Sequence, residues 1–454
     1  MNYQETLDYI YSFVNYEISP AEAYNRRFYN IKRVEELLAR VGNPHKSGKS
    51  VHIAGTNGKG STTVMIAQVL TESGYKTGLF TKPHLIELRE RFQIDNELMT
   101  EDELISITER LRPEITEVNR QATYGKLTTF EVMVAIGFMF YAAHHCDFQV
   151  LEVGLGGTLD ATNVIIPEVS IITPISYDHM DVLGNTLTEI ACAKAGIIKL
   201  GVPVVSSVQR DEAMKVIRDT CIRENAALIR VGHDITCEQR GFREGMQLFH
   251  VGGRLGSYDI GIPLLGYYQT DNVPAAVGAL EVLIEKGYHV TPESIVNGLS
   301  KVNWPGRFQL IDRSPTIVVD GAHNQDSAAR LKEAIEKYFS RGKLTGGAAE
   351  RYSKAILIIG TSSDHDAEAI AHELYPLFDK VIVTRSRHPR AARQEDIVNL
   401  LRKYNVTPEV TANVEEAVKL ARTIAARDDL IVAAGSLFVV GEMLEVVKGW
   451  KVAK

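Results

Sequence analysis

VHIAGTNGKGSTTVMIAQVL, residues 51–70, is the stretch that decides the fold. A short, continuously apolar segment is followed by a glycine-rich turn and then by a pattern typical of a helix. The order strand, glycine-rich turn, helix is typical of α/β proteins that bind phosphate groups at the turn. The stretch therefore predicts a phosphate-binding loop on a parallel sheet.

The turn carries the groups that an anion needs. Its glycines are Gly55, Gly58 and Gly60. Without Cβ atoms, these residues let backbone N–H groups converge on a phosphate, and Lys59 adds a positive charge. A helix that starts at Ser61 adds the positive end of its dipole, and the Ser61 or Thr62 hydroxyl can bind Mg²⁺. Gly60 stands between Lys59 and Ser61, unlike the standard spacing, and the loop alone fits a kinase, a GTPase-like switch or a ligase.

Patterns on either side of the loop predict two α/β domains, residues 1–303 and 304–454. In the first, helices are expected over 7–14, 31–41, 62–70, 129–144, 275–285 and 292–299, and strands over 51–54, 148–153, 169–173 and 202–207. Continuously apolar strands separated by helices are typical of a parallel sheet covered on both faces. Residues 227–266 are glycine-rich and alternate in polarity, which predicts an antiparallel β-ribbon insert.

The second domain follows a joint at Asn303–Arg307, where Pro305 and Gly306 interrupt the pattern. Strands are expected over 316–320, 355–360, 380–384 and 430–435, with helices between them. Residues 341–354 are predicted to form a mobile surface loop.

Composition bounds the class of protein. The chain has 454 residues, 45% of them hydrophobic, and a net charge of −7, which argues against a nucleic-acid surface or a basic membrane patch. It has four cysteines without a C-x-x-C pair, and acidic residues near its N-terminus where a signal peptide would be basic. We expect a cytoplasmic protein that binds neither nucleic acid nor membrane.

A second set of residues lies downstream. Glu152 follows an apolar strand, at the edge where α/β proteins bind ligands, and its carboxylate suits Mg²⁺ beside a phosphate loop. His179 and Lys194 come later, and alone each is more often structural or solvated than functional.

These stretches resemble the folylpolyglutamate synthase/dihydrofolate synthase family of the muramyl-ligase superfamily. The motifs are GTNGKGST, TKPHL, EVGLGGTLDATN, DHMDVLG, AKAGIIK, WPGRFQ and DGAHN, between residues 51 and 324, with a weaker GSLF at 435–438. The resemblance implies an N-terminal P-loop domain that binds ATP and folate, and a smaller C-terminal Rossmann-like glutamate-ligase domain. It also implies ATP and two Mg²⁺ ions as cofactors, folate or dihydropteroate and L-glutamate as substrates, and a monomer.

The resemblance also implies site residues. For ATP they are Gly55, Thr56, Asn57, Gly58, Lys59, Gly60, Ser61, Thr62, Asn272, Arg307 and Asp320. For Mg²⁺ they are Ser61, Glu152 and His179. At the reaction site they are Lys194, expected as a carbamate, with His323, Ser436 and Arg91. On the substrate side they are His84 and Asp160. The chain departs from the family at Lys82, where a serine is usual, and at Ala193, where a glutamate is frequent.

An amide-forming ligase converts a carboxylate into an acyl phosphate with ATP, and an amine then displaces the phosphate. Such phosphoryl transfer depends on positioning and charge neutralisation, which a phosphate loop, metal ions and an arginine provide. Arg307 lies beyond the joint, so we expect the second domain to complete the nucleotide site by closure. Two alternatives remain: a relative acting on another acid, such as a cell-wall peptide precursor, and a nucleotide-switched binding protein.

Overall fold

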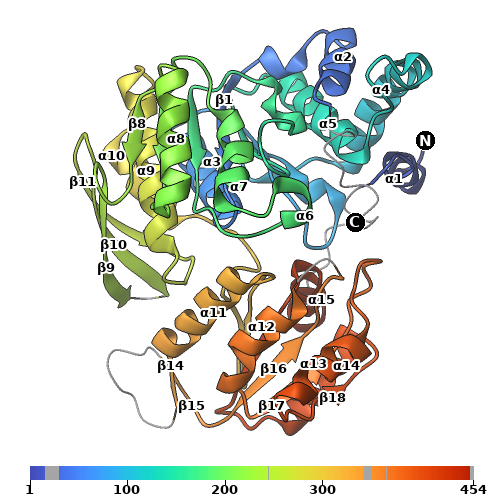
Figure 1. Cartoon of the computed structure of the whole chain (residues 1–454), viewed down its shortest axis with the longest axis vertical. Coiled ribbons are helices and arrows are strands. Elements are labelled where there is room, and N and C mark those ends of the chain that lie inside the picture. Colours follow the sequence, from blue (N-terminus) through green and yellow to red (C-terminus); the bar gives the residue numbers. More distant parts are fainter. Residues whose placement is uncertain (16–29, 244, 342–349, 364–365, 450–454) are drawn as a thin grey trace.

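The computed structural model describes residues 1–15, 30–243, 245–341, 350–363 and 366–449. Two α/β halves lie one above the other along the longest axis, blue to yellow for the first and orange to red for the second (Figure 1). This arrangement confirms the predicted fold class. None of the described helices is long and apolar enough to cross a membrane.

The first half is built on an eight-stranded sheet in the order β4-β3-β2-β5-β1-β6-β7-β8. Its strands are β1 (Lys49–Ala54), β2 (Thr77–Phe80), β3 (Phe92–Ile94), β4 (Glu97–Leu98), β5 (Phe148–Glu152), β6 (Val169–Ile172), β7 (Val204–Ser206) and β8 (Leu228–Arg230). The strands from β2 to β8 in this order pair in parallel, whereas β3 and β4 form an antiparallel edge. The central strands are buried, as continuously apolar segments predict.

Helices cover both faces of this sheet. The helices of this half are α1 (Tyr3–Tyr11), α2 (Lys32–Arg40), α3 (Lys59–Glu72), α4 (Glu101–Gln121), α5 (Thr129–Ala143), α6 (Met180–Leu183), α7 (Leu187–Lys194), α8 (Asp211–Arg223), α9 (Gln269–Glu285) and α10 (Pro292–Ser300). On one face, α3 packs against β1, α9 packs against β6 and β7, and α10 packs on α3, around one core that includes Val51 and Ile53. On the other face, α7 and α8 pack near Ala54 and Ile172. Alternate residues of each strand thus serve two separate cores.

The β-ribbon is shorter than predicted. It consists of β9 (Thr236–Arg243), β10 (Met246–Gly252) and β11 (Ser257–Ile262), which pair antiparallel. The start of the predicted ribbon, residues 228–230, is instead β8 and pairs in parallel with β7. The reason is that α8 returns the chain to the sheet as a crossover helix, and buried Ile229 joins the main core.

The second half has a six-stranded sheet in the order β12-β13-β19-β16-β17-β18. Its strands are β12 (Gln309–Arg313), β13 (Thr316–Val319), β16 (Ala355–Ile359), β17 (Lys380–Val383), β18 (Glu409–Val410) and β19 (Leu430–Ala434), and its helices are α11 (Gln325–Tyr338), α12 (Ala367–Leu374), α13 (Gln394–Lys403), α14 (Val414–Ile424) and α15 (Leu437–Lys448). Only the β12–β13 pair in this sheet is antiparallel within the described residues.

The predicted loop over 341–354 falls partly outside the described residues, because 342–349 are not among them. Its flanks are not loop: β14 (Phe339–Arg341) and β15 (Glu350–Tyr352) pair in parallel. The backbone bonds of these flanks are therefore made with each other rather than with solvent.

The joint between the halves packs on the phosphate loop. A Cβ added at Gly60 would lie 3.1 Å from the Trp304 ring, so the indole covers the first turn of α3. A Cβ at Gly441 in α15 would lie 2.3 Å from the carbonyl oxygen of Leu85. The carboxyl ends of both sheets consequently meet at one interface.

Candidate active site

The phosphate loop, Gly55–Gly60, turns sharply because two of its glycines adopt positive φ. Gly55 has φ +146° and Gly58 has φ +85°. A Cβ at Gly55 would lie 1.8 Å from Oγ1 of Thr173, and one at Gly58 would lie 2.2 Å from Oδ1 of Asn272. Side chains are therefore excluded at both positions by conformation and by space.

Helix α3 begins at Lys59, two residues before the predicted start at Ser61. Gly58 is its N-cap, and the left-handed conformation of this residue brings the chain directly into the first helical turn. The helix N-terminus thus lies at the loop, with the Ser61 side chain buried in its first turn. The positive end of the helix dipole and the N–H groups without helical partners are oriented toward the pocket.

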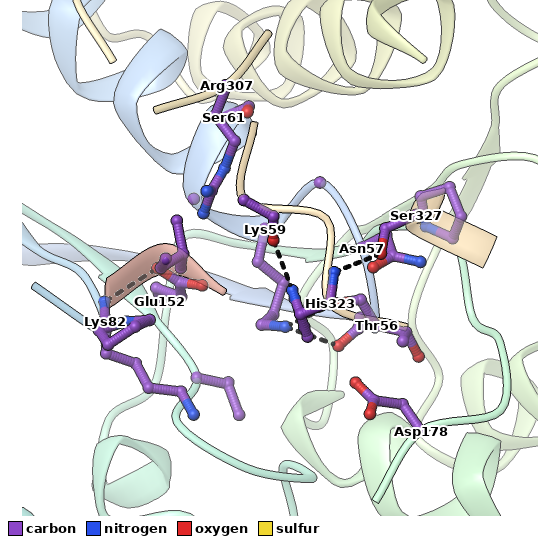
Figure 2. A pocket seen from close by; sticks show the side chains of 18 of the residues that line it. Thr56, Asn57, Lys59, Ser61, Lys82, Glu152, Asp178, Arg307, His323 and Ser327 are labelled. Carbon is purple, nitrogen blue, oxygen red and sulfur yellow. Dashed lines mark hydrogen bonds between the residues drawn. The ribbon is translucent and has the colours of Figure 1, made fainter. Parts of the chain in front are cut away.

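A pocket lies between the halves and takes its walls from both (Figure 2). From the first half come the phosphate loop with Ser61, Lys82, Glu152, Asp178, His179, Lys194, Tyr268 and Asn272. From the second half come Arg307, Asp320, Gly321, Ala322, His323, Ser327, Arg330 and Leu437. The structure therefore brings together residues more than 250 positions apart.

Two lysines, the half-buried Lys59 and the buried Lys194, donate to the loop. The Lys59 ammonium donates to the carbonyl oxygens of Gly55 and Thr56, at 3.1 and 2.9 Å. The Lys194 ammonium donates to the same Gly55 oxygen at 2.6 Å. Burial, together with repulsion by Lys59, lowers the pKa of Lys194 to about 7, and burial also lowers the pKa of Lys59. At neutral pH a large fraction of Lys194 is consequently a neutral amine.

Three carboxylates face these cations. Burial raises the pKa of Glu152, although Lys59 opposes the shift, and its Oε2 accepts a hydrogen bond from the Lys82 backbone N–H at 3.1 Å. Burial likewise raises the pKa of Asp320. For Asp178 burial is outweighed by His179 and the other cations nearby, which together lower its pKa to about 2. Asp178 therefore remains an anion beside the lysines at physiological pH.

Asp320 organises the entry to the second half. Its carboxylate accepts from the backbone N–H groups of Phe308 and Ala322, at 2.7 and 2.8 Å, and from the Tyr268 hydroxyl at 3.4 Å. Phe308 has φ +37°, an uncommon conformation for a bulky residue. These bonds hold the Arg307 segment against the site.

The orientation of the His323 ring is fixed by a backbone group two residues earlier. Its Nδ1 lies 2.8 Å from the carbonyl oxygen of Gly321, and because a carbonyl only accepts, Nδ1 is the donor. Its backbone N–H donates to the Ser327 hydroxyl at 3.0 Å. Figure 2 shows His323 beside the phosphate loop.

Side chains also connect the halves at the rim of the pocket. The Asn57 amide donates to Asp326 at 2.6 Å. Arg330 bonds Asp271 at 3.0 Å and Asp326 at 3.2 Å. These polar contacts hold the halves in the arrangement that closes the pocket.

Most of the predicted site residues line this pocket. Five of them are absent from its described lining: Thr62, His84, Arg91, Asp160 and Ser436. Thr62 is buried one residue further along α3. Ser436 is the N-cap of α15 and accepts the Phe438 N–H at 3.2 Å, directly before Leu437 in the pocket wall.

The other three lie behind the loops that shape the pocket. Arg91 is almost fully buried, and its Nε donates to Nδ1 of His84 at 3.0 Å. Asp160 accepts from the N–H groups of Leu155 and Thr162, at 2.8 and 3.0 Å, and from the Thr162 hydroxyl at 2.5 Å. Asp160 thereby fixes the loop that follows Glu152.

Sequence reasoning missed Asp178, Tyr268, Ser327 and Arg330 as pocket residues, and treated Lys82 only as a departure from a pattern. Asp178 directly precedes His179, so an acidic neighbour of a candidate ligand was a usable signal. Tyr268 and Arg330 carried none, because only the meeting of the two halves places them at the site.

The donor set suits Mg²⁺ held jointly with phosphates. Ser61, Glu152 and His179 line one pocket, but the described residues contain no group of three His, Cys, Asp or Glu side chains that forms a metal site without other ligands. Mg²⁺ is usually bound by one or two carboxylates, water and substrate phosphates. The residues present therefore fit a metal that arrives with the nucleotide.

Comparison with known proteins agrees with this geometry. Residues 53–280 match the Mur ligase middle domain, and residues 306–437 match the Mur ligase glutamate ligase domain. Together with the two-domain pocket, these matches define the chain as an ATP-dependent ligase of the Mur type.

Within that class, the relatives are more specific. A dihydrofolate synthase/folylpolyglutamate synthase of Bacillus subtilis is 30% identical over 97% of this chain and 98% of its own. A Mycobacterium tuberculosis folylpolyglutamate synthase (FPGS) complexed with ADP has a TM-score of 0.89 at 28% identity, covering 99% of both chains. An FPGS–AMPPCP–folate complex has a TM-score of 0.82 at 30% identity, covering 98% of this chain and 99% of that one. The chain belongs to the folylpolyglutamate synthase/dihydrofolate synthase family.

Proposed function

We propose that this protein joins L-glutamate to a folate, with ATP, through an acyl-phosphate intermediate. The observation that carries the proposal is the single pocket in which the phosphate loop and Glu152 of the first half face Arg307, Asp320 and His323 of the second. The names of the relatives, and the complex that holds an ATP analogue with folate, support a folate as the carboxylate substrate.

The arrangement suits phosphoryl transfer to a carboxylate. The loop N–H groups, Lys59 and the α3 N-terminus bind the phosphates, and Arg307 adds positive charge from the other half. The folate carboxylate oxygen attacks the terminal phosphorus of ATP, and ADP departs. The glutamate amine then attacks the activated carbonyl, loses a proton and displaces phosphate. Closure of the halves excludes water from the acyl phosphate.

The test is a glutamate ligation assay. Purified protein receives ATP, Mg²⁺ and labelled glutamate, with tetrahydrofolate, dihydropteroate or a cell-wall peptide precursor in parallel. We expect ADP release that requires both the acceptor and glutamate, with label transferred to tetrahydrofolate. Transfer to dihydropteroate would add the dihydrofolate synthase activity that the Bacillus relative is named for. Equal ADP release without either substrate would support a nucleotide switch instead.

The proposal includes two Mg²⁺ ions and a carbamate on Lys194. Mg²⁺ would be held by Ser61, Glu152 and His179 and would neutralise phosphate charge. A neutral Lys194 amine can attack CO₂, forming a C–N bond and releasing one proton, which replaces a cation with an anion. The pKa of about 7 and the buried position support this reaction. ¹³CO₂ should give a protein-bound carbamate NMR signal that Lys194→Ala removes, with loss of ligation; full activity in Lys194→Ala would contradict it.

We further propose a cytoplasmic monomer. The four cysteines, Cys146, Cys192, Cys221 and Cys237, are all free thiols, as expected in a reducing compartment. Both halves of the pocket come from one chain, so no second copy is needed to complete the site. Sedimentation at assay concentration tests the oligomeric state.

A further inference from the structure

Lys82 lines the pocket, and its charged group is not paired with another side chain in the described part of the protein. It follows β2, and its backbone N–H is fixed by Oε2 of Glu152 at 3.1 Å (Figure 2). Its ammonium group makes no hydrogen bond or ion pair with any residue in the part of the chain that the structure describes. A cation held at a pocket wall without an acceptor is placed for an anion that enters the pocket.

The other pocket lysines differ in this respect. Lys59 and Lys194 donate to loop carbonyl oxygens, and Arg330 is paired with Asp271 and Asp326. Each has an acceptor within the protein. Lys82 is half-buried, like Lys59, but it has no such acceptor among the described residues, so its ammonium group remains available to a ligand while its backbone stays in place.

The position of Lys82 is central to the charges of the site. Its positive charge adds to the lowering of the pKa values of Lys59, His179 and Lys194, and it opposes the burial that raises the pKa of Glu152. A charge that acts on all four residues lies among them and not on an outer surface. In the part of the chain described, this region gathers more cationic than anionic side chains, as suits a polyanionic ligand.

We propose that the Lys82 ammonium binds the non-bridging oxygens of the terminal phosphoryl group of ATP and holds that group as it moves to the carboxylate. This inference rests on the proposed function. During transfer the bond from phosphorus to the ADP oxygen breaks, and a bond to the carboxylate oxygen forms. Lys82 keeps its protons and stays with the oxygens that do not change partners, so it stabilises charge without acid–base chemistry. It supplies, as a side chain, part of the neutralisation that metal ions otherwise provide.

The decisive experiment compares nucleotides that differ in the terminal phosphate. Lys82→Met keeps an unbranched side chain, one atom shorter, and removes the charge. Titration calorimetry with AMPPCP and with ADP, each in EDTA and in Mg²⁺, reports binding without turnover. In EDTA we expect the Kd for AMPPCP to rise roughly 10- to 100-fold, as for loss of one charge-assisted hydrogen bond, and the Kd for ADP to change less than about threefold. Lys82→Arg should restore most of the difference.

Matched controls distinguish the terminal phosphate from any different partner of Lys82. Lys215→Met removes an exposed lysine of α8 and should leave both Kd values unchanged. An equal loss for AMPPCP and ADP would overturn the proposal, because the terminal phosphate would then not be the partner. Unchanged AMPPCP binding with a raised KM for folate would also overturn it, in favour of the substrate carboxylate. Because the nucleotide titrations need no folate, they remain decisive even if glutamate ligation to folate fails, and circular dichroism confirms folding of each variant.

Discussion

The ammonium groups of Lys59 and Lys194, 135 positions apart in the chain, donate to the same acceptor, the carbonyl oxygen of Gly55. The Lys194 side chain is buried and that of Lys59 is half-buried, and the charge of Lys59 lowers the affinity of Lys194 for its proton. The loop thus concentrates positive charge at the point where a nucleotide brings negative charge. Repulsion between the two ammonium groups carries an electrostatic cost, which the neutral form of Lys194 avoids.

Replacement of Lys59 tests the phosphate loop. Lys59→Ala removes the charge and the bonds to Gly55 and Thr56, and we expect loss of ligation by about a hundredfold or more. Steady-state ADP release with glutamate and folate measures it. Lys301→Ala, which removes a surface ion pair with Glu72, is the control and should be close to wild type. Activity retained in Lys59→Ala would exclude a role in phosphate binding.

Lys194 should make the stability of the protein depend on pH. Its pKa in the folded state is about 7, below the ordinary 10.5. Between pH 7 and pH 10.5, Lys194 is therefore protonated in the unfolded chain but mostly neutral in the folded protein. The free-energy cost of burying the charged lysine is therefore at its maximum below pH 7, and it disappears as the pH rises toward 10.5. In CO₂-free buffer, the Tm of Lys194→Met minus that of wild type should fall by several degrees from pH 7 to 10. A difference that stays constant over this range would show that Lys194 titrates normally.

Gly58 and Gly74 have similar backbone conformations but different surroundings, so substitutions at the two positions distinguish the effect of backbone strain from that of steric crowding. Gly58 has φ +85° and Gly74 has φ +87°, but an added Cβ would clash with Asn272 at the first and meet nothing within 4 Å at the second. Gly74→Ala should cost about 1–2 kcal/mol from strain alone and leave nucleotide affinity intact. Gly58→Ala should cost more and weaken ATP binding at least tenfold. Urea unfolding and nucleotide titration measure both, and equal effects at the two sites would contradict the crowding argument.

Arg307 tests the contribution of the second half. Its charge acts on Asp320, Glu152 and Lys59, which places it across the pocket from the phosphate loop. In Arg307→Ala we expect ligation to fall by roughly two or three powers of ten, because arginine stabilises charge in phosphoryl-transfer transition states. ADP binding should fall much less, since the loop N–H groups remain. Rapid-quench measurement of acyl-phosphate formation distinguishes the two, and unchanged ligation would show that Arg307 has no part in the reaction.

The sequence predicted those elements whose residues have a meaning that does not depend on distant parts of the chain. The buried strands β1, β5 and β6 and the phosphate loop were predictable because apolar runs and glycines have local meanings. Helix α4 was missed although its buried residues Leu104, Ile107, Leu111, Ile115 and Val118 follow helical spacing. β8 was assigned to the ribbon because a three-residue strand has no period of its own, and its partner β7 is decided by the path of α8.

The features of the site also fall into those that the sequence predicted and those that only the tertiary structure showed. From the sequence alone came the class of the loop, the carboxylate Glu152 at a strand end, and the joint at Trp304–Gly306, because each depends on residues adjacent in the chain. Only the tertiary structure decided that Arg307 and His323 face that loop and that Lys194 bonds Gly55. The structure also shows that Arg91 lies buried against His84, outside the pocket lining. The reason is physical: which charges meet in a pocket depends on how two separately folded sheets pack, and no local preference of the backbone encodes that contact.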